Sequence, residues 1–137
     1  MYQLVGGCHC GNIRLDIGLS RAPEMYAPRA CDCDFCRNHG AAYVSDPKGS
    51  LAVRIEDAGK AQRYRQGSGS AECLLCTNCG VYVGAFYRDS DGHEYGTVNV
   101  RILGGETRFR AEQVVSPKTL SPEEKAQRWR AIWFPLP

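Results

Sequence analysis

The sequence predicts a mainly β protein with one helix near its C-terminus. Three observations favour this fold class: short segments in which polar and apolar residues alternate, glycine- and proline-containing turns between them, and one well-capped helical segment. At 137 residues the chain is long enough for one domain with its own hydrophobic core. We therefore expect a single domain over residues 1–137, with mainly antiparallel strands.

The expected strands follow the alternation along the chain. Residues 12–17 alternate as a half-buried strand should, which directs Ile13, Leu15 and Ile17 to the core. Residues 20–30 contain two prolines and predict a loop with an edge strand that leads to Cys31. Further strands are expected over residues 51–55, 62–65, 71–76, 81–86 and 97–102.

One helix is well signalled. It begins at Ser121, where a serine N-cap, Pro122 at the first helical position and Glu124 three residues after the serine form a capping box. We expect it to run to about residue 129 or 131. Trp129 and Trp133 are spaced i, i+4, which predicts that they pack the helix onto the sheet.

Composition determines how the eight cysteines are interpreted. The chain is 43% apolar and 23% charged, has no apolar run long enough to cross a bilayer, and begins with no secretory signal. A cytoplasmic location is therefore the default expectation, and this compartment keeps thiols reduced. Cysteines one or two residues apart are poorly placed to bond to each other but converge readily on one ion. The pattern favours metal binding over disulfides.

Four of the cysteines form two close pairs of the kind that a structural zinc ion uses. Cys76 and Cys79 form a C-x-x-C pair followed by Gly80, and Cys8 and Cys10 form a tighter pair. A glycine after the second cysteine is useful because it adopts positive φ and lets backbone N–H groups approach the sulfurs. We assign Cys8, Cys10, Cys76 and Cys79 to a closed structural zinc site.

This assignment leaves three cysteines in one short segment. Cys31, Cys33 and Cys36 supply three ligands for a second zinc ion, whose fourth position must be filled by something else. Three protein ligands with an open position are typical of a catalytic zinc. Such a site binds an incoming thiol and lowers its pKa, so that it is a thiolate near neutral pH.

Together these cysteine clusters resemble the family of glutathione-dependent formaldehyde-activating enzymes, which includes centromere protein V. The resemblance rests on residues 6–11 (Gly-Gly-Cys-His-Cys-Gly), 31–37 (Cys-Asp-Cys-Asp-Phe-Cys-Arg) and 76–80 (Cys-Thr-Asn-Cys-Gly). It extends into residues 98–101 and, more loosely, into the tail ending at 133–135.

The resemblance implies a β-tent fold of antiparallel sheets joined by two zinc ions per chain. It implies a structural zinc on the outer cysteine pairs and a second zinc on the middle three cysteines. The activity that it implies is a carbon–sulfur lyase or synthase reaction, in which glutathione, as co-substrate, adds to formaldehyde to give S-hydroxymethylglutathione. The partners are then a small thiol and a small aldehyde.

Two residues could close the second site and so change this interpretation. Cys73 lies three residues before Cys76, at a position where the family pattern has no cysteine, and His39 follows Cys36 by three residues. As a fourth ligand, either one would make the site structural. The alternatives are a buried, apolar thiol for Cys73 and a solvent-facing histidine for His39. Strand alternation places Cys73 and Cys76 on opposite faces, which keeps Cys73 out of the four-cysteine site.

A second hypothesis is a non-catalytic, zinc-stabilised protein-binding module. In this interpretation Cys73 or His39 completes the second site, and the tail contacts a partner through Arg128, Trp129, Arg130 and Trp133. In the enzyme interpretation, the candidates for binding glutathione carboxylates are Arg14, Arg37 and Arg101, with surface roles as the alternative.

Charge argues against nucleic-acid binding and no segment predicts membrane binding. The formal net charge is +2 with neutral cysteines, and seven thiolates with two zinc ions would bring it to −1. The basic residues are dispersed along the chain rather than clustered.

Overall fold

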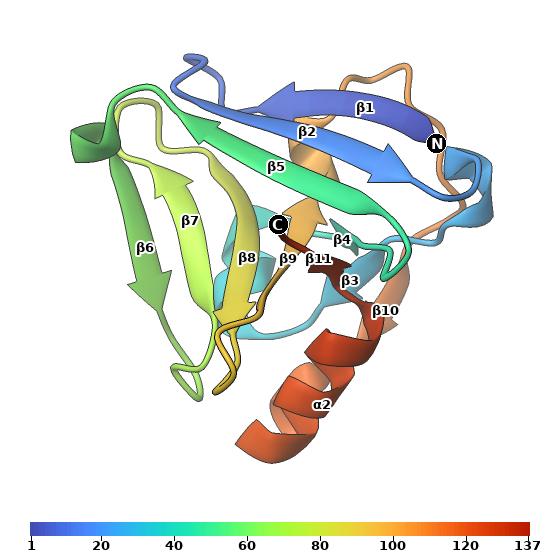
Figure 1. Cartoon of the computed structure of the whole chain (residues 1–137), viewed down its shortest axis with the longest axis vertical. Coiled ribbons are helices and arrows are strands. Elements are labelled where there is room, and N and C mark those ends of the chain that lie inside the picture. Colours follow the sequence, from blue (N-terminus) through green and yellow to red (C-terminus); the bar gives the residue numbers. More distant parts are fainter.

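The computed structural model describes residues 1–137, and its two β-sheets lean against each other above a C-terminal helix (Figure 1). The smaller sheet contains three antiparallel strands in the order β1-β2-β5. Their bounds are β1 (Tyr2–Gly7), β2 (Ile13–Leu19) and β5 (Ser50–Ile55).

The larger sheet has eight strands, of which seven follow the order β10-β3-β4-β9-β8-β7-β6 and β11 pairs with β9. All pairs are antiparallel except β10 with β3. The bounds are β3 (Arg29–Cys31), β4 (Tyr43–Val44), β6 (Ala61–Arg65), β7 (Glu72–Cys76), β8 (Tyr82–Arg88), β9 (Glu94–Asn99), β10 (Gln113–Val115) and β11 (Phe134–Pro135).

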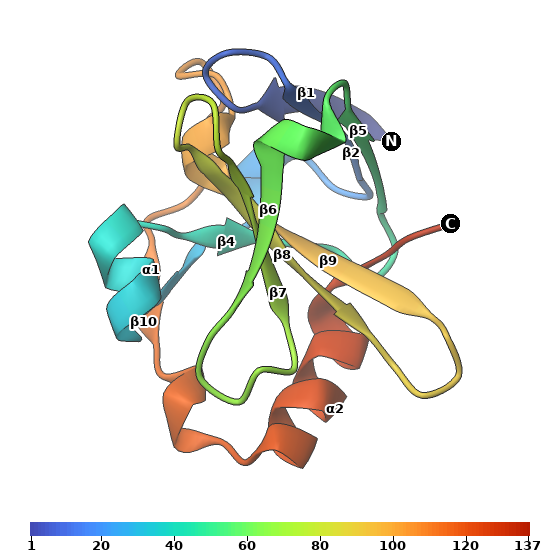
Figure 2. The same cartoon turned by 90° about the vertical axis from the view of Figure 1, so that its left-hand side faces the viewer.

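Two α-helices accompany the sheets. Helix α1 (Asp34–His39) lies on the same side as β10, and α2 (Pro122–Ile132) lies beneath the larger sheet (Figure 2). The predicted capping box is present, because the Glu124 N–H donates to Ser121 Oγ at 3.2 Å and the Ser121 N–H donates to the Glu124 carboxylate at 2.9 Å. Four 3₁₀ turns complete the chain, over Pro23–Met25, Ala58–Lys60, Val100–Ile102 and Pro117–Thr119.

The predicted fold class is confirmed, and the differences lie in local elements. The strand expected over residues 97–102 ends at Asn99, where the Asn99 side chain accepts the Arg101 N–H and starts a 3₁₀ turn. Strand β3 was expected at an edge, but it is flanked by β10 and β4. Strand β1 and helix α1 were not predicted.

The main hydrophobic core lies between the two sheets. On β2 the predicted alternation is confirmed, since Ile13, Leu15 and Ile17 are fully buried while Arg14 is exposed. These side chains pack with residues of the larger sheet and with the final strand, among them Leu74, Val83, Val98 and Phe134. Removing such apolar surface from water is the dominant favourable term in folding.

A second, smaller cluster lies on the other face of the larger sheet. Its buried members come from α1 and the loop after it, from β4, β7 and β8, and from the C-cap of α2: Cys36, Ala41, Tyr43, Cys73, Tyr82, Ala85 and Trp133. The two tryptophans of α2 stack with ring centroids 4.9 Å apart, and Trp129 also contacts Tyr87 of β8 at 5.3 Å. The predicted packing of the helix onto the sheet is therefore confirmed.

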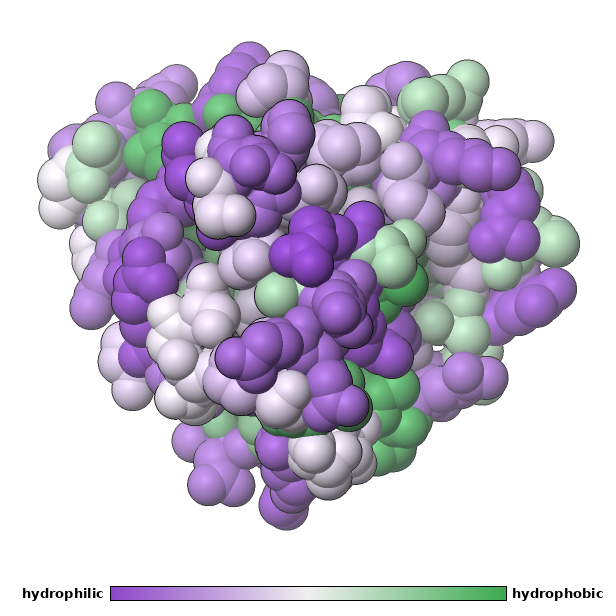
Figure 3. Space-filling model, turned by 60° about the horizontal axis from the view of Figure 1, so that its bottom comes forward, coloured by the Kyte–Doolittle hydropathy of each residue, from purple (hydrophilic) through white to green (hydrophobic).

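The surface outside these clusters carries both hydrophilic and hydrophobic residues (Figure 3). Seen from below, it is mostly hydrophilic, and hydrophobic residues show only in small areas (Figure 3). No helix is long and apolar enough to span a membrane.

A buried carboxylate joins the end of β2 to the turn before β5. Asp46 accepts hydrogen bonds from the Ser20 N–H at 2.8 Å, the Ser20 hydroxyl at 2.6 Å and the Tyr26 hydroxyl at 2.6 Å. Burial acts to raise the pKa of Asp46, but the hydrogen bonds from Ser20 and Tyr26 outweigh it and lower the pKa to about 2.

We expect Asp46→Asn to lower the free energy of unfolding at pH 7 by about 2 kcal/mol, because the bonds lost are charge-assisted. The folded pKa lies below the ordinary value of 3.8, so the carboxylate stabilises the fold above pH 3.8. That contribution is lost as pH falls from 3.8 towards 2, and the variant should lack this part of the acid sensitivity.

Urea unfolding followed by circular dichroism at pH 7 and near pH 2 measures both effects. Asp16→Asn is the matched control, because Asp16 makes only an exposed ion pair with Arg54 on the neighbouring strand. An Asp46→Asn effect no larger than that of the control would contradict the role assigned to Asp46.

Candidate metal centres

The four cysteines of the first cluster meet where the two sheets join. Cys8 and Cys10 lie in the turn between β1 and β2, while Cys76 ends β7 and Cys79 lies in the turn before β8. Their sulfurs all lie within 4.8 Å of one another. The cluster therefore links the small sheet to the large one.

The donor set fits a tetrahedral metal ion. The Sγ atoms of Cys8 and Cys10 are 3.7 Å apart, and those of Cys10 and Cys76 are 3.5 Å apart. Four sulfurs at about 2.3 Å from one zinc ion would be separated by roughly 3.8 Å. All eight cysteines are free thiols.

Backbone groups support these sulfurs. The Ile13 N–H donates to Cys8 Sγ at 3.2 Å, and the Cys79 N–H donates to Cys76 Sγ at 3.5 Å. Gly80 has φ of 82°, as expected for a glycine that follows a metal-binding pair. Burial raises the pKa of Cys8 to about 11, whereas hydrogen bonding, first from the Asn78 side chain, lowers that of Cys10 to about 6.

The second cluster is built at the start of α1. Cys31 ends β3, Cys33 is the N-cap of the helix and Cys36 lies in its first turn. The thiol of Cys33 accepts the Cys36 N–H at 3.4 Å, and Gly40 ends the helix in the left-handed conformation. The three sulfurs lie within 4.8 Å of one another and could also hold a metal ion.

Hydrogen bonds shift the pKa values of two thiols in this cluster in opposite directions. The bond with Cys36 lowers the pKa of Cys31 to about 6, and the same bond, with burial, raises that of Cys36. Cys36 Sγ lies 2.9 Å from the Tyr43 hydroxyl, which lies 2.8 Å from the Tyr82 hydroxyl. A thiolate at Cys36 requires Tyr43 to donate to it, and Tyr82 in turn to donate to Tyr43.

The two residues that could have closed the second site lie outside its group of sulfurs. Cys73 is buried on β7, where burial raises its pKa to about 11. His39 is exposed at the end of α1, and its ring packs against Phe35 and Tyr82 with centroids 4.7 and 5.2 Å away. The cluster thus has three converging protein ligands.

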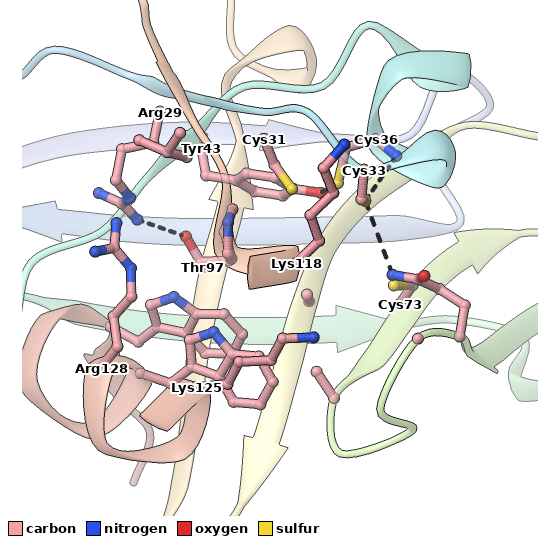
Figure 4. Close-up of a pocket in the computed structure, with 18 of the residues that line it drawn as sticks. Arg29, Cys31, Cys33, Cys36, Tyr43, Cys73, Thr97, Lys118, Lys125 and Arg128 are labelled. Atoms are coloured by element: carbon pink, nitrogen blue, oxygen red, sulfur yellow. Dashed lines mark hydrogen bonds between the residues drawn. The ribbon is translucent and has the colours of Figure 1, made fainter. Parts of the chain in front are cut away.

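These three cysteines face a cavity of about 150 Å³ between the larger sheet and α2. Figure 4 shows the sulfurs on one side of this cavity and the α2 side chains on another. Trp129, Ile132 and Trp133 form an apolar wall. The Gln66 amide approaches Cys33 Sγ at 4.0 Å, and Cys73 completes the lining on the β7 side.

The charged residues that line the cavity are all cations. They are Arg29, Lys118, Lys125 and Arg128, and no aspartate or glutamate lines the cavity. Burial, and then the neighbouring charge of Arg128, lowers the pKa of Arg29 to about 10, so it remains a cation at neutral pH. This arrangement suits an anionic ligand.

The arginines that the sequence suggested for carboxylate binding are elsewhere. None of Arg14, Arg37 and Arg101 lines the cavity, and Arg101 binds both carboxylate oxygens of Glu112 at 2.6 and 2.9 Å. Helical spacing could have revealed part of the correct set. Residues 125, 128, 129 and 132 lie on one face of α2, Trp133 is its C-cap, and all of them line the cavity.

The fold and the two cysteine clusters together define a small, mainly β protein able to hold two metal ions, one away from the cavity and one beside it. The family model described as "Glutathione-dependent formaldehyde-activating enzyme" matches residues 3–119. The chain therefore belongs to the family of glutathione-dependent formaldehyde-activating enzymes.

The crystal structure of a Rhodobacter sphaeroides protein has a similar fold, with a TM-score of 0.54 and 27% sequence identity. The match covers 88% of this chain and 94% of the other. No curated protein matches the sequence.

We expect Cys73→Ser to retain the full metal content of the wild-type protein, because Cys73 lies outside both groups of sulfurs. Cys76→Ser should lose one metal equivalent and unfold at lower temperature, since its sulfur belongs to the cluster that joins the sheets. Metal analysis by mass spectrometry and thermal unfolding measure these outcomes. Loss of an equivalent from Cys73→Ser would identify Cys73 as a ligand.

Proposed function

We propose that this protein is a zinc-dependent enzyme that adds glutathione, or a related thiol, to formaldehyde or another small aldehyde. With formaldehyde the product is S-hydroxymethylglutathione, and the reverse reaction is a carbon–sulfur lyase reaction. The observation that carries this proposal is the set of three sulfurs beside a cavity, with no fourth protein ligand among them.

The two clusters have different roles in the proposal. Cys8, Cys10, Cys76 and Cys79 would hold a structural zinc, and Cys31, Cys33 and Cys36 would hold a second zinc with one position free. Zinc bound there would supply the positive charge that keeps an incoming thiol deprotonated near neutral pH.

The residues around the second cluster orient its ligands. With zinc bound, Cys36 would be a thiolate, to which the Tyr43 hydroxyl 2.9 Å away would donate, and the Tyr82 hydroxyl, 2.8 Å from that of Tyr43, would donate to Tyr43. Such outer hydrogen bonds set the direction of a ligand and reduce the negative charge on its sulfur. The stacked tryptophans give the cavity an apolar wall.

Lysines at the edge of the cavity suit the carboxylates of glutathione. Lys118 is exposed and Lys125 half-buried, and each presents an ammonium group that can pair with a carboxylate. Lys118 also lies 3.8 Å from the Asp32 carboxylate, whereas Lys125 has no ion-pair partner in the protein.

The proposed reaction forms one carbon–sulfur bond. The thiolate sulfur of the co-substrate attacks the aldehyde carbon, and the π electron pair of the carbonyl moves to its oxygen. That oxygen takes up one proton, which replaces the proton that the thiol released to solvent. The product is a hemithioacetal.

The protein-binding alternative has less support in the geometry. It required Cys73 or His39 to complete the second cluster, and neither lies in that group. In that hypothesis Trp129 and Trp133 are among the residues that contact a partner, yet Trp133 is buried and both tryptophans line the cavity.

We expect Cys33→Ser to lose one of two zinc equivalents while it keeps the fold, because Cys33 belongs only to the cavity cluster. The variant should no longer accelerate exchange between free formaldehyde and its glutathione adduct, which exchange spectroscopy by NMR measures. Cys73→Ser is the matched control at a cysteine outside the cluster. A wild-type protein that binds a single zinc ion would contradict the proposal.

Lys125→Gln should raise the KM for glutathione by about threefold, since it removes one partly exposed charge partner of a carboxylate. The KM for 2-mercaptoethanol, which carries no carboxylate, should change less. Lys60→Gln provides the control, because Lys60 is exposed in the turn before β6 and does not line the cavity. Equal changes for the two thiols would exclude a carboxylate contact at Lys125.

A further inference from the structure

Arg29 carries a charge that the protein does not neutralise. Its Nη2 donates to Ser45 Oγ at 2.7 Å and to Thr97 Oγ1 at 3.4 Å, which are both uncharged acceptors. No aspartate or glutamate lies within ion-pair distance of Arg29 or Arg128. Arg29 is half-buried, and such a guanidinium without a carboxylate partner is unfavourable in a folded protein unless a ligand supplies the anion.

The hydroxyl groups hold Arg29 in a fixed place. Ser45 Oγ donates to the Ile132 carbonyl at 2.7 Å, and Thr97 Oγ1 donates to the Val44 carbonyl at 3.2 Å. The N–H groups on Arg29 Nη1 and Nε have no acceptor in the protein, although Arg29 lines the cavity. Such a preorganised guanidinium suits a planar carboxylate, which it can bind through two parallel hydrogen bonds.

A second guanidinium lies beside the first. Arg128 is half-buried on α2 and lines the same cavity. In Figure 4 the two guanidinium groups lie together on the side of the cavity away from Cys33 and Cys73. Two cations held together in this way favour an anion between or beside them.

The position of Arg29 relative to the sulfurs indicates a small ligand. Arg29 and Cys31 are two residues apart on β3, so their side chains leave the strand on the same face. Their Cα atoms are separated by about 6.6 Å, from a rise of 3.3 Å per residue. A molecule with a carboxylate near Arg29 and a reactive carbon near the sulfurs therefore needs only a short skeleton.

The thiol co-substrate does not account for all four cations. Glutathione has two carboxylates, at the far ends of the tripeptide from its sulfur, and the lysines at the edge of the cavity are available for them. Its ammonium group would find no acidic partner, because no aspartate or glutamate lines the cavity. Formaldehyde is uncharged and needs none of these cations.

We propose that Arg29 and Arg128 form a carboxylate subsite for the carbonyl substrate, which makes small oxo acids, with glyoxylate the simplest, substrates of this enzyme. This inference rests on the proposed function and defines its substrate class. The thiolate sulfur forms a bond to the oxo carbon, and the carbonyl oxygen receives the π electron pair and one proton. The carboxylate remains unchanged on the two guanidinium groups.

Binding is tested without thiol and without turnover. Trp129 and Trp133 are the only tryptophans of the chain and both line the cavity, so intrinsic tryptophan fluorescence reports on this cavity alone. Zinc-loaded protein is titrated with glycolate and with its uncharged counterpart glycolamide at constant ionic strength. Saturable binding of glycolate, at least about tenfold tighter than that of glycolamide, is expected from a charge-assisted contact. Equal responses to the two probes would overturn the subsite.

Substitutions test whether the two arginines are responsible for glycolate binding. Arg29→Gln and Arg128→Gln should each weaken glycolate binding by about tenfold. Arg130→Gln is the matched control, because Arg130 is exposed on the same helix and does not line the cavity. If Arg29→Gln fails to fold by circular dichroism, Arg128→Gln carries the test. Unchanged glycolate binding in Arg128→Gln would overturn the proposal.

Kinetics separates the carbonyl substrate from the thiol as the source of the carboxylate. With 2-mercaptoethanol as the thiol, the ratio of kcat/KM for glyoxylate to that for acetaldehyde should fall by about tenfold in Arg128→Gln. A rise in the KM for glutathione with an unchanged ratio would assign the arginines to the thiol and overturn the inference. Glycolate binding without any thiol addition would instead overturn the proposed function and leave the carboxylate subsite standing.

Discussion

The junction of the two sheets at four cysteine sulfurs is the constraint on which the rest of the structure depends. Cys8 and Cys10 come from the small sheet, Cys76 and Cys79 come from the large one, and no disulfide or helix links the sheets at this point. The hydrophobic core between the sheets gives their contact its favourable free energy, but apolar packing is not directional. Directional metal–sulfur bonds would fix the angle at which the sheets meet.

Because the first cluster joins the two sheets, the second cluster is not needed to hold them together. It lies on the opposite side of the large sheet from the main core, where α1 presents Cys33 and Cys36 beside Cys31 at the end of β3. Beside this cluster lie two buried hydroxyl groups: the Tyr82 hydroxyl is hydrogen-bonded to that of Tyr43, which is hydrogen-bonded to the Cys36 sulfur. A buried polar group lowers the stability of the fold unless it has a hydrogen-bonding partner. Here the partners connect the two hydroxyls to a sulfur of the second cluster.

The charged groups around the cavity are also arranged for a ligand rather than for the stability of the fold. Four cations line the cavity without one carboxylate, and one of them, Arg29, is held by uncharged hydroxyls. A half-buried charge without an opposite charge beside it lowers the stability of the folded protein, so it is expected where ligand binding requires it. The exposed arginines elsewhere, such as Arg101 with Glu112, have ordinary partners and contribute to the surface.

The sequence by itself determined the fold class, the two cysteine groups and the C-terminal helix. Alternation, capping residues and cysteine spacing are local patterns, and the same local physics forms the elements that they predict. It did not indicate α1, because a cysteine thiol acts there as an N-cap in place of the usual serine or aspartate. Only the tertiary structure decided that Cys73 and His39 stay outside the second cluster and that Arg29, not Arg101, lies by the cavity. These outcomes depend on contacts between side chains from elements that are far apart in the chain, and local sequence patterns do not predict such contacts.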